Sequence, residues 1–499
     1  ASDVYKRQIL LTLLLAGGLV ACGNDRITAD VSEYLTQDQK EELVKDDKTF
    51  ASDLRGALLQ SNANKLQTFW DTHDDFGLKA YHMTFDLMGE DMVAKGLDWF
   101  DWEYNYVTVT ANTRRVRTYW NMWYEIIANC NSFINDAPEP SEDNAPFYAY
   151  RGIAYWHLAN FYQATYKGNE SKMAVPIMLK DTDVDLARNT VKEVYDQAIK
   201  DLTIGIEHCA ATKDDHTDMD KYVVAAYLAK LYACMEDWAN VEKYAKMAIE
   251  GGKDIVPEFP LSWNVNNSDV IWGYDVTPAT STSWASFYSH MDPTNGNYCG
   301  RGQRRLIYAW LYDQMQDNDT RRQLFVNQKD YPEIAVDFVD KKTGEKYYYP
   351  DYTSMKFVVT NADNLNSDYI FLRVQDPILL AIEAQNELGK TAEAKKALEE
   401  FVGKRAEGYT APADQKALRD EIRIQRRIEL WGEGNGVWDM KRWHLNVDRS
   451  KTSVKGTQSN HTESAFTSLD PNAIQYIHCL PQNQLDINKN LQQDPRPTK

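Results

Sequence analysis

Cysteine is scarce in this sequence, acidic residues outnumber basic ones, and long hydrophobic runs are almost absent. Six cysteines in 499 residues are too few for a fold held together by disulfides. The 55 Lys and Arg face 74 Asp and Glu, and the net charge of −19 repels phosphate backbones, so we expect no nucleic acid partner. A hydrophobic content of 43% is nevertheless enough to fill a large core.

The motifs of common catalytic sites are also missing. The sequence contains no HExxH, no P-loop, no GxSxG and no Cys-x-x-Cys, the patterns of metalloproteases, nucleotide-binding proteins, serine hydrolases and thiol redox or metal sites. Glycoside hydrolases work with two carboxylates, but no such pair stands out among the 74 acidic residues. We therefore predict no enzyme activity, no cofactor and no metal ion, with a glycoside hydrolase as an alternative.

The hydrophobic run at residues 9–20 predicts the compartment. Basic residues precede it, and its length suits a signal peptide, whereas a membrane-spanning helix needs about 20 residues. The run ends in Leu-Val-Ala-Cys-Gly at 19–23, which resembles the lipobox of bacterial lipoproteins. We predict a signal peptide over 1–21 and acylation of Cys22, whose acyl chains anchor the protein at about 0.8 kcal/mol per buried CH₂. An ordinary secretory signal or a short buried helix is the alternative.

Much of the remaining chain shows the spacing of amphipathic helices. Apolar residues recur every three to four positions in segments 38–60, 113–134 and 146–166. Thr190 and Glu193 form a capping box, in which each side chain satisfies a backbone N–H at a helix start. This pair predicts a helix that continues to about residue 209.

Two pairs of alanine-containing segments predict helical hairpins. They are residues 222–235 with 238–251, and residues 378–388 with 392–402. Small residues let antiparallel helices approach closely, as in tetratricopeptide repeats, and each pair leaves an apolar face for a neighbouring pair to cover. The predicted fold class is all-α, a tetratricopeptide-like repeat scaffold over about 38–251 and 370–445 with long irregular insertions and a few short strands. Unrelated helical hairpins are the alternative.

An irregular, aromatic-rich insert separates the two hairpins. Residues 254–368 are rich in Gly, Asn, Asp and Thr, and we expect only short strands in them, at 268–274 and 355–360. Between positions 263 and 352, 17 of 90 residues are aromatic, above the 12% of the whole chain. A second dense aromatic cluster lies at 99–106. Both clusters are predicted to be loops, where rings are available for binding.

Five stretches resemble the signatures of one bacterial family, in the same order along the chain. The longest runs over 426–443 and contains RRIELWGEG and DMKRW. The others contain Tyr150-Arg151 and Ala154-Tyr155, Arg188-Asn189-Thr190 and Glu193-Val194-Tyr195, Leu372-Arg373 and Glu383-Ala384, and Leu480-Pro481 and Leu485-Asp486. Together with the lipobox they are similar to SusD/RagB-type outer-membrane lipoproteins. The resemblance implies one SusD-like domain over 22–499, lipid-anchored and surface-exposed at the outer membrane of a Bacteroidetes-like bacterium.

The charged residues of the longest stretch allow two interpretations. Acid–base catalysis is one, because several carboxylates and guanidinium groups lie close together in sequence. The other is structural, because buried charges need partners. We predict the second for this set, as ion pairs that tie the C-terminal helix to the repeats: Arg426, Arg427, Glu429, Glu433 and Asp439.

The family resemblance implies that loops on one face of the scaffold capture an oligosaccharide. Flat aromatic rings complement the apolar C–H faces of sugars, and polar side chains bind the hydroxyl edges. The residues expected to bind ligand are Trp99, Trp102, Trp284, Tyr288, Tyr298, Asp91, Asn295, Asn297 and Arg301. The implied partner is a SusC-like TonB-dependent transporter, to which the glycan is delivered for polysaccharide utilization. RagB-like capture of peptides and a protein-interaction module without a small ligand are the alternatives.

Overall fold

The structure is a computed structural model that describes most of the chain. The described residues are 48–70, 72–96, 99–106, 110–180, 182–212, 215–258, 261, 263–339, 341–359, 367–470 and 473–495. The predicted signal peptide and Cys22 lie outside them. The chain divides into two compact units, 1–58 and 59–499. Helix α3 (Lys48–Gln67) contains the boundary, and the description below concerns the second unit.

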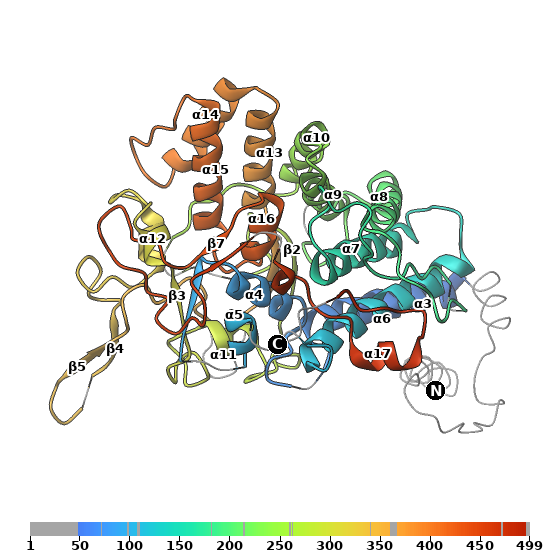
Figure 1. Ribbon diagram of the computed structural model, residues 1–499, viewed down its shortest axis with the longest axis horizontal. Helices are drawn as coiled ribbons and strands as arrows, with labels where there is room; N and C mark the ends of the chain where they lie inside the picture. The colour runs from blue at the N-terminus through green and yellow to red at the C-terminus, as the bar shows by residue number, and fades with distance from the viewer. Residues whose placement is uncertain are drawn as a thin grey trace. The chain divides into compact units, whose positions relative to one another are not determined.

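Helices that follow one another in sequence pack against one another (Figure 1). The first series is α6 (Arg114–Asp136), α7 (Ala145–Tyr162), α8 (Val191–His208), α9 (Lys221–Met235) and α10 (Trp238–Ile249). The series continues across the insert, because α10 packs on α13, and α13 packs on both α14 and α15. The bounds of these three are Gln375–Glu387, Thr391–Gly403 and Gln415–Glu429. The predicted all-α class is confirmed, whereas the tetratricopeptide-like repeat stays a prediction.

Local sequence explains where these helices begin and how closely they pack. The Thr190 hydroxyl accepts the N–H of Glu193 at 3.2 Å, and the Glu193 carboxylate accepts the N–H of Thr190 at 2.7 Å. The predicted capping box is therefore confirmed as the start of α8. Helices α7 and α8 approach closely at Gly152, where an added Cβ would lie 2.8 Å from the side chain of Leu202.

The second unit also contains shorter helices. Helix α4 (Gly77–Met88) is buried along its whole length. The others are α5 (Asp101–Asn105), α11 (Phe287–Met291), α12 (Ala309–Tyr312), α16 (Gly436–Arg442), α17 (Gln482–Ile487) and the 3₁₀ helices Thr320–Leu324 and Ile474–Tyr476. The aromatic segment at 99–106, predicted to be a loop, thus contains α5. No helix of the described segments is long and apolar enough to cross a bilayer.

Within the described residues, eight short strands form four antiparallel pairs. β1 (Met92–Lys95) pairs with β3 (Arg304–Ile307), β2 (Val270–Tyr274) with β6 (Tyr369–Arg373), β4 (Val336–Val339) with β5 (Lys346–Tyr348), and β7 (Val447–Asp448) with β8 (Ser468–Leu469). The strand predicted at 268–274 is confirmed as β2. The strand predicted at 355–360 is wrong over its described part. Pairing there stops after single bridges at Thr353 and Ser354, and Met355 and Phe357 turn into the core instead.

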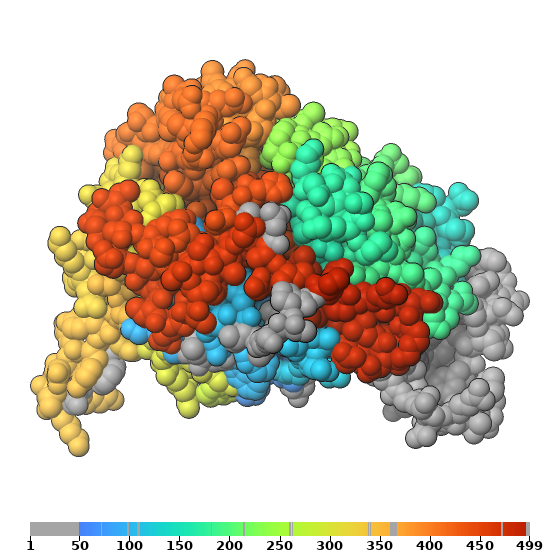
Figure 2. Space-filling view, viewed as in Figure 1, coloured from blue at the N-terminus to red at the C-terminus, as the bar shows by residue number. Residues whose placement is uncertain are grey.

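The C-terminal segment returns to the first helices. The N–H of His478 donates to the carbonyl oxygen of Phe161 in α7 at 3.1 Å. Arg188, just before α8, pairs with Asp494 at 2.9 Å. In Figure 2 this segment, coloured red, runs across the visible face and touches the green-blue helices. The C-terminal segment therefore packs against α7 and the segment just before α8.

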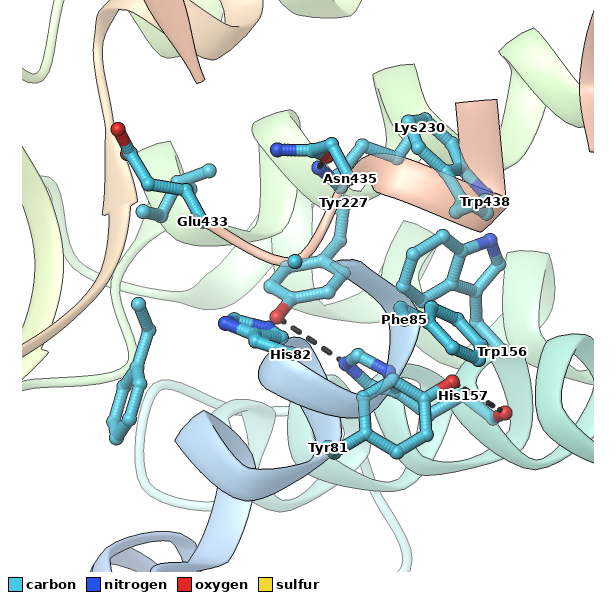
Figure 3. Close-up of a pocket in the computed structure, with 13 residues that line it drawn as sticks. Tyr81, His82, Phe85, Trp156, His157, Tyr227, Lys230, Glu433, Asn435 and Trp438 are labelled. Atoms are coloured by element: carbon cyan, nitrogen blue, oxygen red, sulfur yellow. Dashed lines mark hydrogen bonds between the residues drawn. The ribbon is translucent and has the colours of Figure 1, made fainter. Parts of the chain in front are cut away.

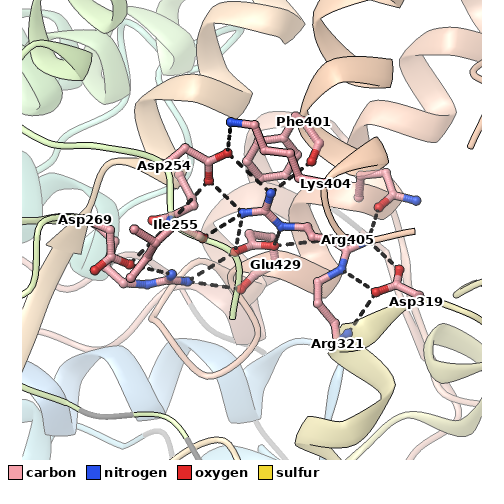
Figure 4. A network of polar contacts seen from close by, with 12 residues as sticks. Asp254, Ile255, Asp269, Asp319, Arg321, Phe401, Lys404, Arg405 and Glu429 are labelled. Carbon is pink, nitrogen blue, oxygen red and sulfur yellow. Dashed lines mark hydrogen bonds and ion pairs between the residues drawn. The ribbon is translucent and has the colours of Figure 1, made fainter. Parts of the chain in front are cut away.

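The charged residues of the 426–443 stretch form ion pairs inside the protein. Arg426 has no exposed surface and pairs with Asp376 at 2.7 Å and with Asp439 at 2.8 Å. Glu429 is equally buried and pairs with Arg405 and Arg321, as Figure 4 shows. The structural interpretation of these charges is confirmed: they join α15 to α13, α16 and the insert.

The Asp376 ion pairs predict how stability depends on pH. Burial disfavours the charged carboxylate, but Arg426 and Lys230 outweigh it and lower the pKa of Asp376 to about 2. This value lies below the pKa of about 3.9 in an unfolded chain, so the carboxylate stabilises the fold by about 2 kcal/mol above about pH 4. That contribution is lost as the pH falls through about 2.

We expect the urea midpoint of unfolding to fall as the pH drops from about 4 to about 2, and to fall less steeply in Asp376→Asn. This variant also starts from a lower midpoint at neutral pH. Asp420→Asn is the matched control, because Asp420 forms an exposed pair with Lys416. Equal slopes in the two variants would contradict the assignment.

Candidate ligand-binding site

Four rings from separate loops meet at one place, which we call the ring cluster: His73, Trp99, Trp284 and Tyr298. Trp284 and Tyr298 meet edge to face with centroids 5.0 Å apart. The ring centroid of His73 lies 6.0 Å from that of Trp99 and 6.4 Å from that of Trp284. The Nδ1 atom of His73 lies 2.5 Å from the Tyr298 hydroxyl oxygen. Three of the predicted ligand-binding residues are thus brought together although about 200 positions separate the first from the others.

The ring cluster is accessible from solvent. Trp99 exposes 41% of its surface, His73 is exposed, and Trp284 and Tyr298 are half-buried. Large aromatic side chains are usually withdrawn from water, so a group of them at the surface is a common sign of a binding site. The arrangement can stack against a flat apolar ligand face.

Buried neighbours hold the cluster in place. The ring of His290 in α11 has no exposed surface and stacks on Tyr298 at 4.9 Å. Its Nε2 donates to the carbonyl oxygen of His73 at 2.7 Å, so one buried ring positions two members of the cluster. Below Tyr298 the chain turns tightly at Gly300, where an added Cβ would lie 1.4 Å from the carbonyl oxygen of Asn295. The binding surface is therefore preorganised.

Arg301, also a predicted site residue, lies at the edge of the cluster. Its guanidinium carbon lies 4.9 Å from the Trp284 ring centroid, which is within the range of a cation–π contact. Its Nε donates to the carbonyl oxygen of Gly296 at 2.5 Å. This side chain is exposed, so it adds a positively charged group beside the aromatic surface.

The other predicted site residues are placed elsewhere. Tyr288 is buried, and its hydroxyl donates to the carbonyl oxygen of Asp368 at 2.6 Å. Asp91 is also buried and pairs with Arg427. Trp102 is 42% exposed on α5 and makes no ring contact with the cluster among the described residues.

Asn295 and Asn297 shape the loop that carries Tyr298. The Asn295 side-chain oxygen accepts the N–H of Asn297 at 2.8 Å, and its amide donates to the carbonyl oxygen of Tyr288 at 3.4 Å. Asn295 is buried, whereas Asn297 is half-buried. Their contacts stabilise the turn that carries Tyr298.

His73 was missed by the sequence interpretation. It follows α3 in a short loop, and a single histidine in a loop carries no signal of its own. Its place in the cluster depends on the buried His290, which lies more than 200 positions later and contacts its carbonyl group. Only the three-dimensional arrangement identifies this residue.

A small cavity lies inside the protein, between α4, α7, α9 and α16 (Figure 3). Its lining includes His82, His157, Tyr227, Lys230 and Trp438. The cavity volume is about 20 Å³, which suits a single water molecule. A sugar ring does not fit, so the exposed ring cluster is the better candidate for a ligand site. In the described parts of the chain, no three His, Cys, Asp or Glu side chains converge as a metal site.

Two family profiles match the sequence. The profile described as "SusD family" matches residues 307–496, and the one described as "Starch-binding associating with outer membrane" matches residues 40–233. Among curated proteins, the SusD-like protein P25 of Formosa agariphila is 22% identical over 387 residues, which cover 68% of this chain and 72% of the relative.

Several solved structures of Bacteroides proteins have the same fold. A SusD-like carbohydrate binding protein from Bacteroides vulgatus is similar with a TM-score of 0.74 and 22% identity, over 88% of this chain and 96% of the other. A SusD superfamily protein from Bacteroides thetaiotaomicron also has a TM-score of 0.74, with 18% identity over 89% and 99% of the two chains. A surface glycan-binding protein A from Bacteroides fluxus has a TM-score of 0.66 and 16% identity, over 90% of this chain and 99% of the other. The two profiles together span more than half of the sequence, and the chain belongs to the SusD family.

Proposed function

We propose that the protein captures an oligosaccharide at the outer membrane without altering it, and that the ring cluster is the capturing surface. The observation that carries this proposal is the exposed, preorganised group of Trp99, Trp284 and Tyr298 around His73. The names of two solved relatives support it, because they describe a carbohydrate-binding and a glycan-binding protein.

The chemistry of capture needs only contact. The indole of Trp284 offers a flat face for the C–H groups of a sugar ring, with Tyr298 standing at its edge. The imidazole of His73 and the hydroxyl of Tyr298 supply hydrogen-bonding groups for the sugar hydroxyls. No bond is formed or broken, so release follows from a change in affinity.

The proposal includes a place and a partner for this capture. Acyl chains on Cys22 hold the protein at the outer membrane, where it delivers the glycan to a SusC-like TonB-dependent transporter. The lipobox-like residues at 19–23 and the profile description "associating with outer membrane" support the location. The transporter is supported by the family alone.

Affinity electrophoresis and a reducing-end assay test the proposal directly. We expect the purified protein to be retarded in a gel containing at least one polysaccharide of a broad panel, and to release no reducing ends from it. A parallel panel of peptides tests the alternative of peptide capture. Retardation by no polysaccharide together with tight peptide binding would contradict the proposal, and release of reducing ends would favour a hydrolase.

A further inference from the structure

The chain carries −19 overall, yet two arginines border the ring cluster. Arg301 lies 4.9 Å from the Trp284 ring, and Arg114 lies 5.8 Å from the Trp99 ring. A chain with this excess of acid repels anionic ligands at a distance, so local cations at the site decide whether such a ligand is accepted.

The two arginines differ in whether they form an ion pair with a carboxylate of the protein. Arg114 donates to the buried carboxylate of Asp74, which Arg115 also contacts at 2.7 Å. Arg301, in contrast, forms no ion pair with any residue in the part of the chain that the structure describes. Its Nε donates to the carbonyl oxygen of Gly296, so among the described residues both terminal nitrogens are available to a ligand.

The position of Arg301 suits an anion on the ligand. The five N–H groups of a guanidinium lie in the plane of that group, and its two terminal nitrogens match two oxygens of a carboxylate or sulfate. The hydrogen bond to Gly296 and the Trp284 ring restrict its motion, so little rotamer freedom is lost on binding. A surface arginine that only covers an indole needs no such fixed geometry.

We infer that the ligand is an acidic glycan, and that Arg301 binds a carboxylate or sulfate group carried by the sugar unit that stacks on Trp284. This inference rests on the proposed function, since the same ring cluster holds the sugar. It specifies the substrate class and gives Arg301 a role in selectivity. The shared chemistry is a planar or tetrahedral oxyanion, supplied by a uronic acid or by a sulfate ester.

Matched pairs of glycans test this inference. The probes are oligogalacturonate against its fully methyl-esterified form, and a carrageenan oligosaccharide against its desulfated form, measured by isothermal titration calorimetry. We expect at least one anionic probe to bind about tenfold more tightly than its neutral partner, which is the size of one charge-assisted hydrogen-bonded contact. The pair that shows the preference identifies the oxyanion.

Two variants assign the preference to its residue. Arg301→Gln is expected to abolish it and to leave the neutral partner bound within about twofold. Lys346→Gln is the control, because it removes one positive charge from the exposed β4–β5 hairpin at the lower left of Figure 1. This variant is expected to keep the preference for the anionic probe. Equal affinity within both pairs, or a preference that survives in Arg301→Gln, overturns the inference while leaving glycan capture intact. Binding of no glycan at all overturns the proposed function as well.

Discussion

Replacing Glu429 by glutamine is expected to lower the free energy of unfolding by about 3 kcal/mol, because it removes the anion from a buried ion-pair network. The carboxylate lies 2.8 Å from Arg405 and 3.3 Å from Arg321, as drawn in Figure 4, and 3.7 Å from Arg373. Burial disfavours its charge, but these three guanidinium groups outweigh that effect and hold the pKa of Glu429 well below its usual value. Glutamine keeps the shape and leaves three buried cations without the anion they share.

The measurement is the urea midpoint of unfolding, followed by tryptophan fluorescence. Glu400→Gln is the matched control, since Glu400 forms an exposed pair with Lys396 at 3.7 Å and is expected to contribute less than about 0.5 kcal/mol. A midpoint for Glu429→Gln as high as that of the control would show that the network contributes nothing to stability.

The Glu429 network also explains how distant parts of the chain fix the loops of the insert. Arg373 ends β6, Arg321 belongs to the 3₁₀ helix at Thr320–Leu324, and Arg405 follows α14. Arg373 also binds Glu433 at 2.6 Å. Arg321 lies in the middle of the insert and Arg373 lies just after its end, so one carboxylate on α15 connects the insert to the helical series.

The helices could be predicted from the sequence because their signals are local. Apolar residues recurring every three to four positions predict a helix over 113–134, and the structure has α6 at Arg114–Asp136. The strands depend instead on partners far away in the chain. β1 becomes a strand only because β3, about 210 positions later, pairs with it. Residues 355–359 have a suitable composition, but no continuous partner strand lies beside them.

The candidate site shows the same limit more sharply. Tyr288 and Tyr298 are both tyrosines of one aromatic-rich segment, and the sequence offers no means to tell them apart. In the structure Tyr288 belongs to the buried helix α11, whereas Tyr298 stands on a loop against the ring of Trp284. Which ring reaches the surface is decided by packing between elements, and that information is not local. The residue types were therefore predictable, and the cluster was not.

Replacing Trp284 by alanine is expected to weaken glycan binding about thirtyfold, the largest effect we predict for the site. A sugar ring stacked on the indole buries about 80 Å² of apolar surface, which at about 25 cal/mol per Å² corresponds to about 2 kcal/mol. The substitution also removes the support of Arg301, whose guanidinium rests on the same ring. Trp284 is half-buried in a loop, so its loss affects binding more than folding.

The experiment is a titration with the glycan found in the polysaccharide panel, on Trp284→Ala, Trp284→Phe and a control. Phenylalanine keeps a smaller flat face, so we expect Trp284→Phe to bind with an affinity between wild type and Trp284→Ala. Tyr348→Ala removes an aromatic side chain that is 45% exposed on β5, and is expected to change the affinity by less than twofold. If Trp284→Ala binds as tightly as Tyr348→Ala, the ring cluster is not the surface that holds the sugar, since a stacked indole cannot be removed without losing the contact it makes.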